Sequence, residues 1–175
     1  MWVFLFGDLT LFAVFFVLYL AYRAKERDLF LVAQQNLNPG AGFVNTLLLL
    51  TSSLFVVLAM RDIRRLRPRA ATRMIAAAFL GGLGFVIVKF FEYRSELTHG
   101  FVPDINDFAA CYYLLTGFHL FHLVLGMGVL VFLSTRARLP RLTARQLAVV
   151  EGGACFWHLV DLLWIILFPL LYLAK

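Results

Sequence analysis

The sequence is short of charged residues. Asp, Glu, Lys and Arg make up 15% of its 175 residues, whereas soluble proteins average about 25%. Hydrophobic residues make up 62%, and a soluble chain of this length has too much surface for its volume to bury them all. The composition therefore excludes a water-soluble domain and indicates a protein whose natural solvent is the lipid bilayer.

Cysteine is scarce as well, with two residues in the chain. Cys111 and Cys155 form no C-x-x-C pair and no spacing typical of metal ligands. No cleavable signal peptide is expected, because Met1 runs into apolar sequence without a basic segment and Asp8 interrupts that run. The first apolar stretch is therefore predicted to remain as a membrane-spanning helix.

Five apolar stretches are long enough to cross a bilayer as helices, which takes about 20 residues each. The connections between them are too short to hold a soluble domain. The sequence thus predicts an all-α fold, a polytopic membrane helix bundle with five transmembrane helices in a single domain of residues 1–175. The predicted spans are residues 2–22, 42–60, 74–93, 108–133 and 147–173.

Basic residues collect in two of the predicted loops. The loop at 61–73 holds six arginines against one acid, and the loop at 134–146 holds four arginines and no acid, whereas the loop at 94–107 is acidic. Cytoplasmic loops are enriched in Lys and Arg, so we expect the N-terminus inside and the C-terminus outside. The formal net charge of +6 is explained by this topology, and no nucleic-acid partner is expected.

Ionisable residues inside the spans are costly, so each needs a partner or a purpose. Lys89 and Glu92 are three residues apart and are expected to form an ion pair near the outer interface, with the Lys89 side chain reaching toward the headgroups. Asp8 has no partner within its own helix turn. It must pair with another helix, contact water or stay protonated, which makes it the candidate for a proton role.

Histidines and acids also recur in the last two spans. His119 and His122 are three residues apart, and either hydrogen bonds to neighbouring helices or metal ligation would suit them. Glu151, His158 and Asp161 share one helix face, where a hydrogen bond between His158 and Asp161 is expected. The simplest interpretation makes all these residues, with Lys89 and Glu92, ties between helices or lipid contacts. It predicts no catalytic, cofactor-binding or metal-ligating residue in the chain.

Two other functions stay open on the residues alone. An independent intramembrane metalloprotein could use the histidines and acids of the last two spans, namely His119, His122, Glu151, His158 and Asp161, although no Glu-x-x-His motif occurs within those two spans. A small proton-conducting or transport protein would instead be centred on Asp8, although the odd number of spans and the lack of internal symmetry disfavour a transporter.

Five segments, in chain order and at matching helical depth, resemble the motifs of subunit III of the haem-copper oxidase superfamily. The resemblance covers essentially the whole chain. The segments are residues 2–8 (W-V-F-L-F-G-D, with Asp8 where oxidases usually have Glu), 45–53 (N-T-L-L-L-L-T-S-S), 89–93 (K-F-F-E-Y), 112–123 (Y-Y-L-L-T-G-F-H-L-F-H-L) and 151–164 (E-G-G-A-C-F-W-H-L-V-D-L-L-W).

The resemblance implies an accessory role, as a subunit of an oxidoreductase complex of the cytochrome c oxidase or nitric oxide reductase type in the bacterial inner membrane. Haem, with copper or non-haem iron, would belong to the partners, the catalytic subunit I and its electron-input subunit. Subunit III of this superfamily binds phospholipid in a cleft and supports the stability and proton uptake of the catalytic subunit. The chain corresponds to the last five of the usual seven helices, so one wall of that cleft would be lacking. Asp8 and the segment 155–172 look most similar to the five-helix NorE-type branch, which accompanies nitric oxide reductases.

Overall fold

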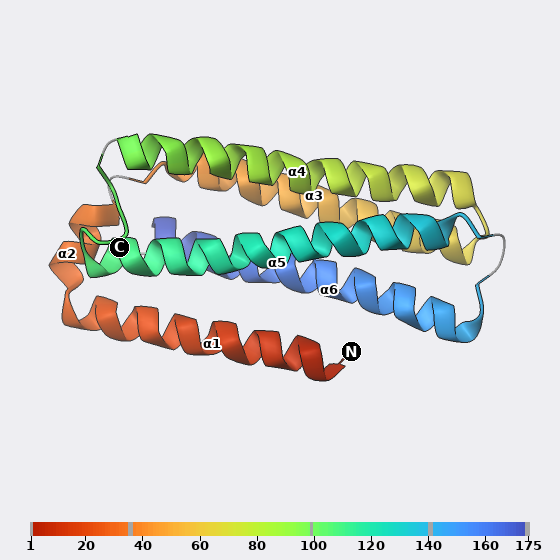
Figure 1. Cartoon of the computed structure of the whole chain (residues 1–175), viewed down its shortest axis with the longest axis horizontal. Coiled ribbons are helices and arrows are strands. Elements are labelled where there is room, and N and C mark those ends of the chain that lie inside the picture. Colours follow the sequence, from red (N-terminus) through yellow and green to blue (C-terminus); the bar gives the residue numbers. More distant parts are fainter. Residues whose placement is uncertain (1, 35–36, 99, 140–141, 174–175) are drawn as a thin grey trace.

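The structure is a computed structural model that describes residues 2–34, 37–98, 100–139 and 142–173, with side chains from residue 6 onward. Long antiparallel helices form one bundle, and the described residues contain no strand (Figure 1). All five long helices are apolar enough to span a membrane, which confirms the predicted five-span, all-α fold. They are α1 (Trp2–Lys25), α3 (Pro39–Arg64), α4 (Pro68–Thr98), α5 (Asp107–Ala137) and α6 (Ala144–Phe168).

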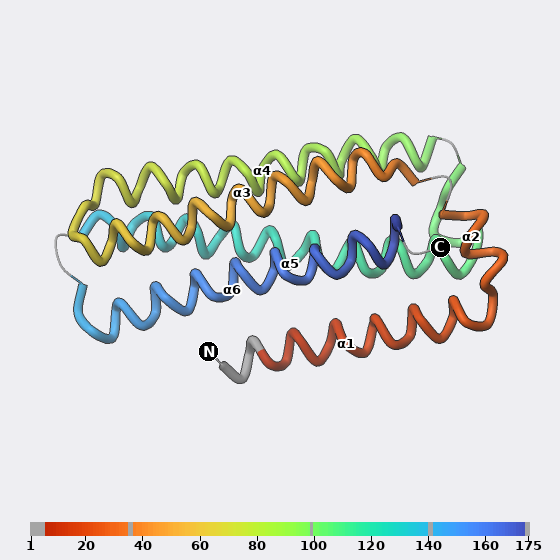
Figure 2. Tube along the Cα trace, turned by 180° about the vertical axis from the view of Figure 1, so that it is seen from behind, coloured from red at the N-terminus to blue at the C-terminus, as the bar shows by residue number. Residues whose placement is uncertain are grey.

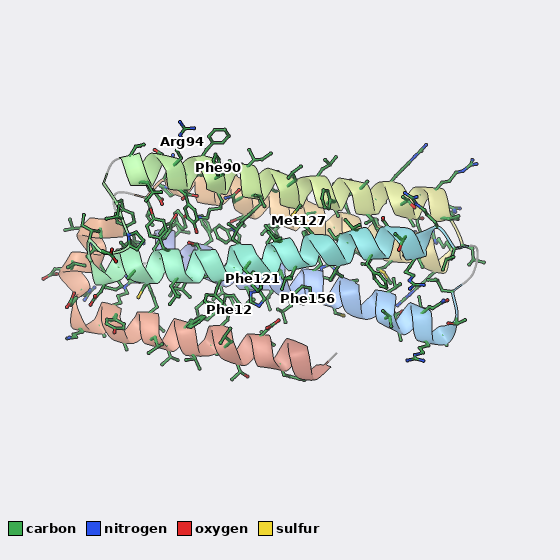
Figure 3. All side chains as sticks on the ribbon, viewed as in Figure 1. Phe12, Phe90, Arg94, Phe121, Met127 and Phe156 are labelled. Atoms are coloured by element: carbon green, nitrogen blue, oxygen red, sulfur yellow. The ribbon has the colours of Figure 1, made fainter. Side chains whose placement is uncertain are left out.

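The helices extend beyond the predicted spans. Helix α4 has 31 residues and is about 46 Å long at 1.5 Å per residue, whereas the hydrocarbon core of a bilayer is about 30 Å thick. Its ends therefore reach the headgroup region, where charged residues are tolerated. Figure 3 shows Phe90 and Arg94 pointing outward from one end of α4. Hydropathy marks only the apolar middle of such a helix, which is why the predicted spans are too short.

Short-range signals explain where the helices begin. Asn38 caps α3, since its Oδ1 accepts a 2.9 Å hydrogen bond from the backbone N–H of Gly40. Pro39 follows as the first helical residue. A backbone N–H at this position has no acceptor within the helix, so proline, which lacks the N–H, is well tolerated there. Pro68, expected in a loop, opens α4 for the same reason. Thr143 and Gln146 form a capping box at the start of α6.

Two short elements differ from the predicted helices. Helix α2 (Arg27–Gln34) falls in the first predicted loop and turns Phe30 and Ala33 inward. At the other end of the chain, Pro169 has no N–H to continue α6, and the chain passes into the π-helix η1 (Pro169–Leu173). Tyr172 of η1 is buried, so the end of the last span belongs to the core.

The helices pack as two pairs with α1 outside them. α3 lies along α4, α5 lies along α6, and α1 lies against α5 and α6 (Figures 1 and 2). Of the described side chains of α1, only Asp8, Phe12 and Tyr19 are buried. The Tyr19 hydroxyl donates to the Leu170 carbonyl oxygen at 3.0 Å and so attaches α1 to η1. Most of the apolar surface of α1 therefore faces the surroundings of the bundle.

The two arginine-rich connections lie at one end of the bundle. One pocket there is lined by Arg64 and Arg67, near the α3–α4 junction, together with Arg136 from the end of α5. The α4–α5 connection lies at the opposite end (Figure 1). Grouping of the basic loops at one end is what a membrane topology set by positive charge requires. The cytoplasmic location of that end stays a prediction.

Trp157 of α6 fills the centre of the bundle between two glycines. Its side chain is almost fully buried. A Cβ atom on Gly82 of α4 would lie 2.8 Å from the Trp157 ring, and one on Gly126 of α5 would lie 2.9 Å from it. Small residues allow such close approach between membrane helices. The two glycines therefore let α4 and α5 close on the indole.

Gly126→Ala should lower the stability of the bundle by about 1–3 kcal/mol, the usual cost of overpacking a filled core. Gly128→Ala is the matched control on the same helix, because a Cβ there would meet nothing within 4 Å. Thermal unfolding in mild detergent measures both changes. Equal midpoints for the two variants would contradict the packing role of Gly126.

Candidate functional site

A buried polar cluster joins α4, α5 and η1 near the α4–α5 connection. Its charged members are Lys89, Glu92 and Glu96, all on α4. Lys89 Nζ lies 3.1 Å from Glu92 Oε2 and donates to the hydroxyls of Tyr112 at 3.0 Å and Tyr172 at 2.8 Å. The Tyr172 hydroxyl donates to Glu92, and that of Tyr112 donates to Glu96 Oε1 at 2.9 Å. The expected Lys89–Glu92 pair is thus one part of a larger network.

Lys89 does not reach toward the headgroups as expected. It is 1% exposed, and its Nζ lies within 5.4 Å of four aromatic ring centroids, those of Tyr93, Tyr112, Trp164 and Tyr172. Aromatic faces attract a cation, more strongly when it is desolvated. The rings and hydroxyls therefore hold Lys89 inside the bundle, where α4, α5, α6 and η1 meet around a single cation. This arrangement suits a structural role for Lys89 better than a catalytic one.

Asp8 finds its partner on another helix. Its Oδ1 lies 3.3 Å from Nε2 of His122 on α5, 114 residues away in the chain. The other ring nitrogen of His122, Nδ1, is 2.8 Å from the Phe118 carbonyl oxygen, which can only accept, so Nδ1 carries hydrogen. A hydrogen bond at Nε2 therefore joins His122 to Asp8 and ties α1 to α5.

The Asp8–His122 pair lies at the contact between α1 and the rest of the bundle. Phe12 of α1 packs edge-on against the His122 ring at 5.3 Å, and Phe15 packs against Phe118 at 5.0 Å between centroids. Asp8 Oδ2 is buried without a hydrogen-bond partner. The side chains of Asp8 and His122 are 12% and 6% exposed, so both are more accessible than the Lys89 side chain at 1%.

His119 makes no hydrogen bond to any described residue. It is fully buried, and both ring nitrogens lack a partner. Its ring instead packs against Phe85 at 5.5 Å and against Trp164 at 5.2 Å between centroids. His119 therefore connects α4, α5 and α6 by ring packing rather than by the expected polar tie.

The prediction of a hydrogen bond between His158 and Asp161 is wrong. His158 Nδ1 hydrogen-bonds the Ser53 hydroxyl of α3 instead, and Asp161 Oδ1 has no partner. Three positions on α6 place the two side chains at different angles around the helix, so His158 meets the Ser53 hydroxyl instead of Asp161. Ser53 and His158 are both half-buried, so this polar tie reaches the outer surface of the α3–α6 seam.

Glu151 pairs with a residue of the arginine-rich end. Its Oε1 lies 2.8 Å from Nη2 of Arg64 on α3, with side chains 40% and 64% exposed. Exposed ion pairs of this kind contribute at most about 1 kcal/mol. Although Glu151 shares a helix face with His158, the two residues serve separate contacts along the same seam.

The described residues contain no group of three or more His, Cys, Asp and Glu side chains placed to hold a metal ion. The five residues of the metalloprotein alternative form no such group. His122 faces Asp8, His119 packs among aromatic rings, and Glu151 pairs with Arg64. The donor geometry thus does not favour an intramembrane metal site.

Sequence reasoning missed four members of these clusters, namely Ser53, Glu96, Tyr112 and Tyr172. Glu96 follows Glu92 by one helical turn on the same face, and this spacing was the available signal. The other three are common polar residues within apolar spans. Their roles depend on which helices become neighbours, and no local pattern carries that information.

Comparison with known proteins agrees with the geometry. The family model for cytochrome c oxidase subunit III matches residues 1–174. The probable cytochrome c oxidase subunit 3 of Mycobacterium tuberculosis (strain ATCC 25618 / H37Rv) is 30% identical over 173 residues, which cover 99% of this chain and 85% of that protein. The cytochrome c oxidase subunit 3 of Alkalihalophilus pseudofirmus is 32% identical over 182 residues, 98% and 84% of the two chains.

A third relative is the heme-copper oxidase subunit I+III of Aeropyrum pernix, 28% identical over 182 residues, which cover 99% of this chain and 22% of that larger protein. The matches span the whole bundle, and the Mycobacterium tuberculosis and Alkalihalophilus pseudofirmus relatives come from bacteria. The chain is therefore a multi-pass bacterial membrane protein, and it belongs to the cytochrome c oxidase subunit III family.

Proposed function

We propose that this chain is a non-catalytic accessory subunit of a terminal oxidase, which packs on the haem-bearing subunit I and supports its stability and proton uptake. The observation that carries the proposal is the Asp8–His122 contact, in which Asp8 Oδ1 of α1 lies 3.3 Å from His122 Nε2 of α5 at the edge of the bundle. A titratable carboxylate inside a membrane span is costly unless it has a partner or a function.

Partnership with subunit I is supported by two observations. The Aeropyrum pernix relative carries subunits I and III in one polypeptide. In this chain, Ser53 and His158 are half-buried polar residues on the outer face of the α3–α6 seam. Polar side chains within a membrane normally face protein or water rather than lipid. The seam is thus the face on which we expect a membrane partner to pack.

The difference in exposure between the two charged clusters supports the proton role of Asp8. The Lys89 and Glu92 side chains are 1% and 4% exposed, whereas the Asp8 side chain is 12% exposed. Proton exchange requires contact with water or with another exchanging group. The Lys89 cluster is therefore assigned to holding the fold, and the Asp8–His122 pair to exchange.

The partner identity is the first test. The chain purified from its native membrane in mild detergent should bring down a haem-bearing subunit, and the haem spectrum and oxygen consumption of the preparation identify an oxidase. Recovery of a nitric-oxide-reducing complex would instead support the NorE-type partnership. Stoichiometric iron or copper bound to the isolated chain would contradict the accessory role.

Asp8→Asn should leave the initial turnover of the complex unchanged and shorten the time over which activity is sustained. The Asn amide can donate a hydrogen bond to His122 but cannot release a proton, so exchange at the pair stops. The measurement is oxygen consumption followed over many turnovers, at equal haem content.

Asp8→Glu is the matched control, because it retains a carboxyl group on the same helix face. It should sustain activity as the wild type does. A structural role for Asp8 would impair both variants through assembly, which haem content reports separately. Sustained activity in Asp8→Asn equal to the wild type would reject the proton role.

Lys89→Met should destabilise the chain by about 3–5 kcal/mol, because Glu92 and Glu96 would stay buried without their cation. Arg94→Met is the control, since it removes an exposed charge from the same helix and should change stability by less than about 0.5 kcal/mol. Thermal unfolding in mild detergent compares them. Similar midpoints would show that the Lys89 cluster does not hold the fold.

A further inference from the structure

The Lys89 cluster contains one more acid than base. Among the described residues, its ion pair and hydrogen bonds join one cation, Lys89, to two carboxyl groups, those of Glu92 and Glu96. Arg94, the next basic residue of α4, is exposed and points outward from the bundle (Figure 3). With both carboxyl groups ionised, the cluster would keep one negative charge inside the bundle without a cation. A buried group in that position usually takes up a proton and becomes neutral.

Glu92 is the carboxyl group that the cation supports. Its Oε2 lies 3.1 Å from Lys89 Nζ, and its Oε1 accepts a hydrogen bond from the Tyr172 hydroxyl. Lys89 Nζ also donates to that hydroxyl at 2.8 Å, so the ammonium group, the hydroxyl and the carboxylate form a closed set. A cation and a donor at such distances stabilise a carboxylate in its charged form.

Glu96 has much weaker support. It is 7% exposed, its Oε1 accepts one hydrogen bond, from the Tyr112 hydroxyl at 2.9 Å, and its Oε2 is buried without a hydrogen-bond partner. The Tyr113 hydroxyl is also close to Glu96. It donates its hydrogen to the Phe101 carbonyl oxygen at 2.8 Å and therefore has none to offer to Oε2. A protonated carboxyl group carries its own donor, which the free side of the Tyr113 oxygen can accept.

We propose that Glu96 holds a proton at neutral pH, and that the Lys89 cluster is a pH-sensitive tie between the ends of α4 and α5 and η1. With this proton in place, the charges of the cluster sum to zero. Loss of the proton would leave an unpaired negative charge among buried groups of three elements and would weaken their contact. The titratable groups that face Glu96 among the described residues are Lys89, Glu92 and Tyr93 of α4, Tyr112 and Tyr113 of α5, and Tyr172 of η1.

Glu96 lies near the aqueous end of its helix. Helix α4 ends at Thr98, and the backbone N–H of Phe101 in the α4–α5 connection donates to the Glu96 carbonyl oxygen at 3.0 Å. The arginine-rich connections lie at the opposite end of the bundle (Figure 1), so the positive charges predict that the Glu96 end faces outside. The inference goes beyond the proposed function and does not depend on it, because the proton role proposed there belongs to Asp8.

Infrared spectroscopy of the full chain in mild detergent tests the protonation directly. At neutral pH, the wild-type spectrum minus that of Glu96→Gln should contain the C=O band of a carboxylic acid. Glu151→Gln is the matched control, since the Glu151 carboxylate pairs with Arg64 and is half exposed. Its difference spectrum should contain the bands of an ionised carboxylate. Carboxylate bands in place of the acid band for Glu96 would overturn the proposal.

The pH dependence of unfolding tests the tie. Between about pH 6 and about pH 9, an ordinary lysine stays charged and an exposed glutamate is ionised. The folded wild type then binds one proton more than the unfolded chain, so its stability should fall as pH rises, and the unfolding equilibrium constant should rise by up to about tenfold per pH unit. Glu96→Gln keeps the shape and neutrality of the protonated carboxyl group. It should match the wild type at the acidic end of this range and lose less stability toward the alkaline end.

Parallel pH profiles for the wild type and Glu96→Gln would overturn the proposal, because groups elsewhere in the chain would then account for the whole pH dependence. If Glu96→Gln fails to fold, the wild type alone decides. Its carboxylic acid band should disappear over the same pH range in which its unfolding midpoint falls. An acid band that persists while the midpoint falls would reject Glu96 as the sensitive group.

Discussion

The structure depends on one constraint, the cost of leaving a polar group unpaired where no water can reach it. Lys89 illustrates the constraint. A cation that is 1% exposed is retained by a carboxylate, two tyrosine hydroxyls and four aromatic faces, drawn from α4, α5, α6 and η1. Because the partners come from different helices, satisfying the cation also fixes how those helices are rotated and shifted. Apolar packing around Trp157 then fills the remaining space.

The number of spans could be predicted because the bilayer sets a length that apolar runs must match. The family could be predicted because its motifs occur in order along the chain. Helix ends were less predictable, since α4 continues through residues such as Arg69 and Arg94 that hydropathy assigns to loops. Helix α2 was missed because its inward face amounts to little more than Phe30 and Ala33, too short a pattern to distinguish from a loop.

The contacts of the candidate site also differ in how far the sequence predicts them. Lys89 and Glu92 lie on one helix, so their spacing alone predicts the pair. Asp8 with His122, and Ser53 with His158, are 114 and 105 residues apart. Such pairs require knowledge of which helices are neighbours, and a single sequence does not contain it in local form. The wrong His158–Asp161 pairing came from the same limit, because spacing along α6 does not show that α3 offers the hydroxyl.

Distribution of the polar groups argues for an accessory role more strongly than any single residue does. A catalyst brings its acids, bases and ligands together around one reacting atom. In the described chain, the ionisable residues of the spans are divided among the Lys89 cluster, the Asp8–His122 pair, the α3–α6 seam and the ring packing of His119, and most meet a residue of another helix. Asp8 differs from the rest because α1 is peripheral and the Asp8 side chain is 12% exposed. The same constraint that fixes the fold at Lys89 is met at the edge of the bundle by the contact between Asp8 and His122, which ties the peripheral helix α1 to α5.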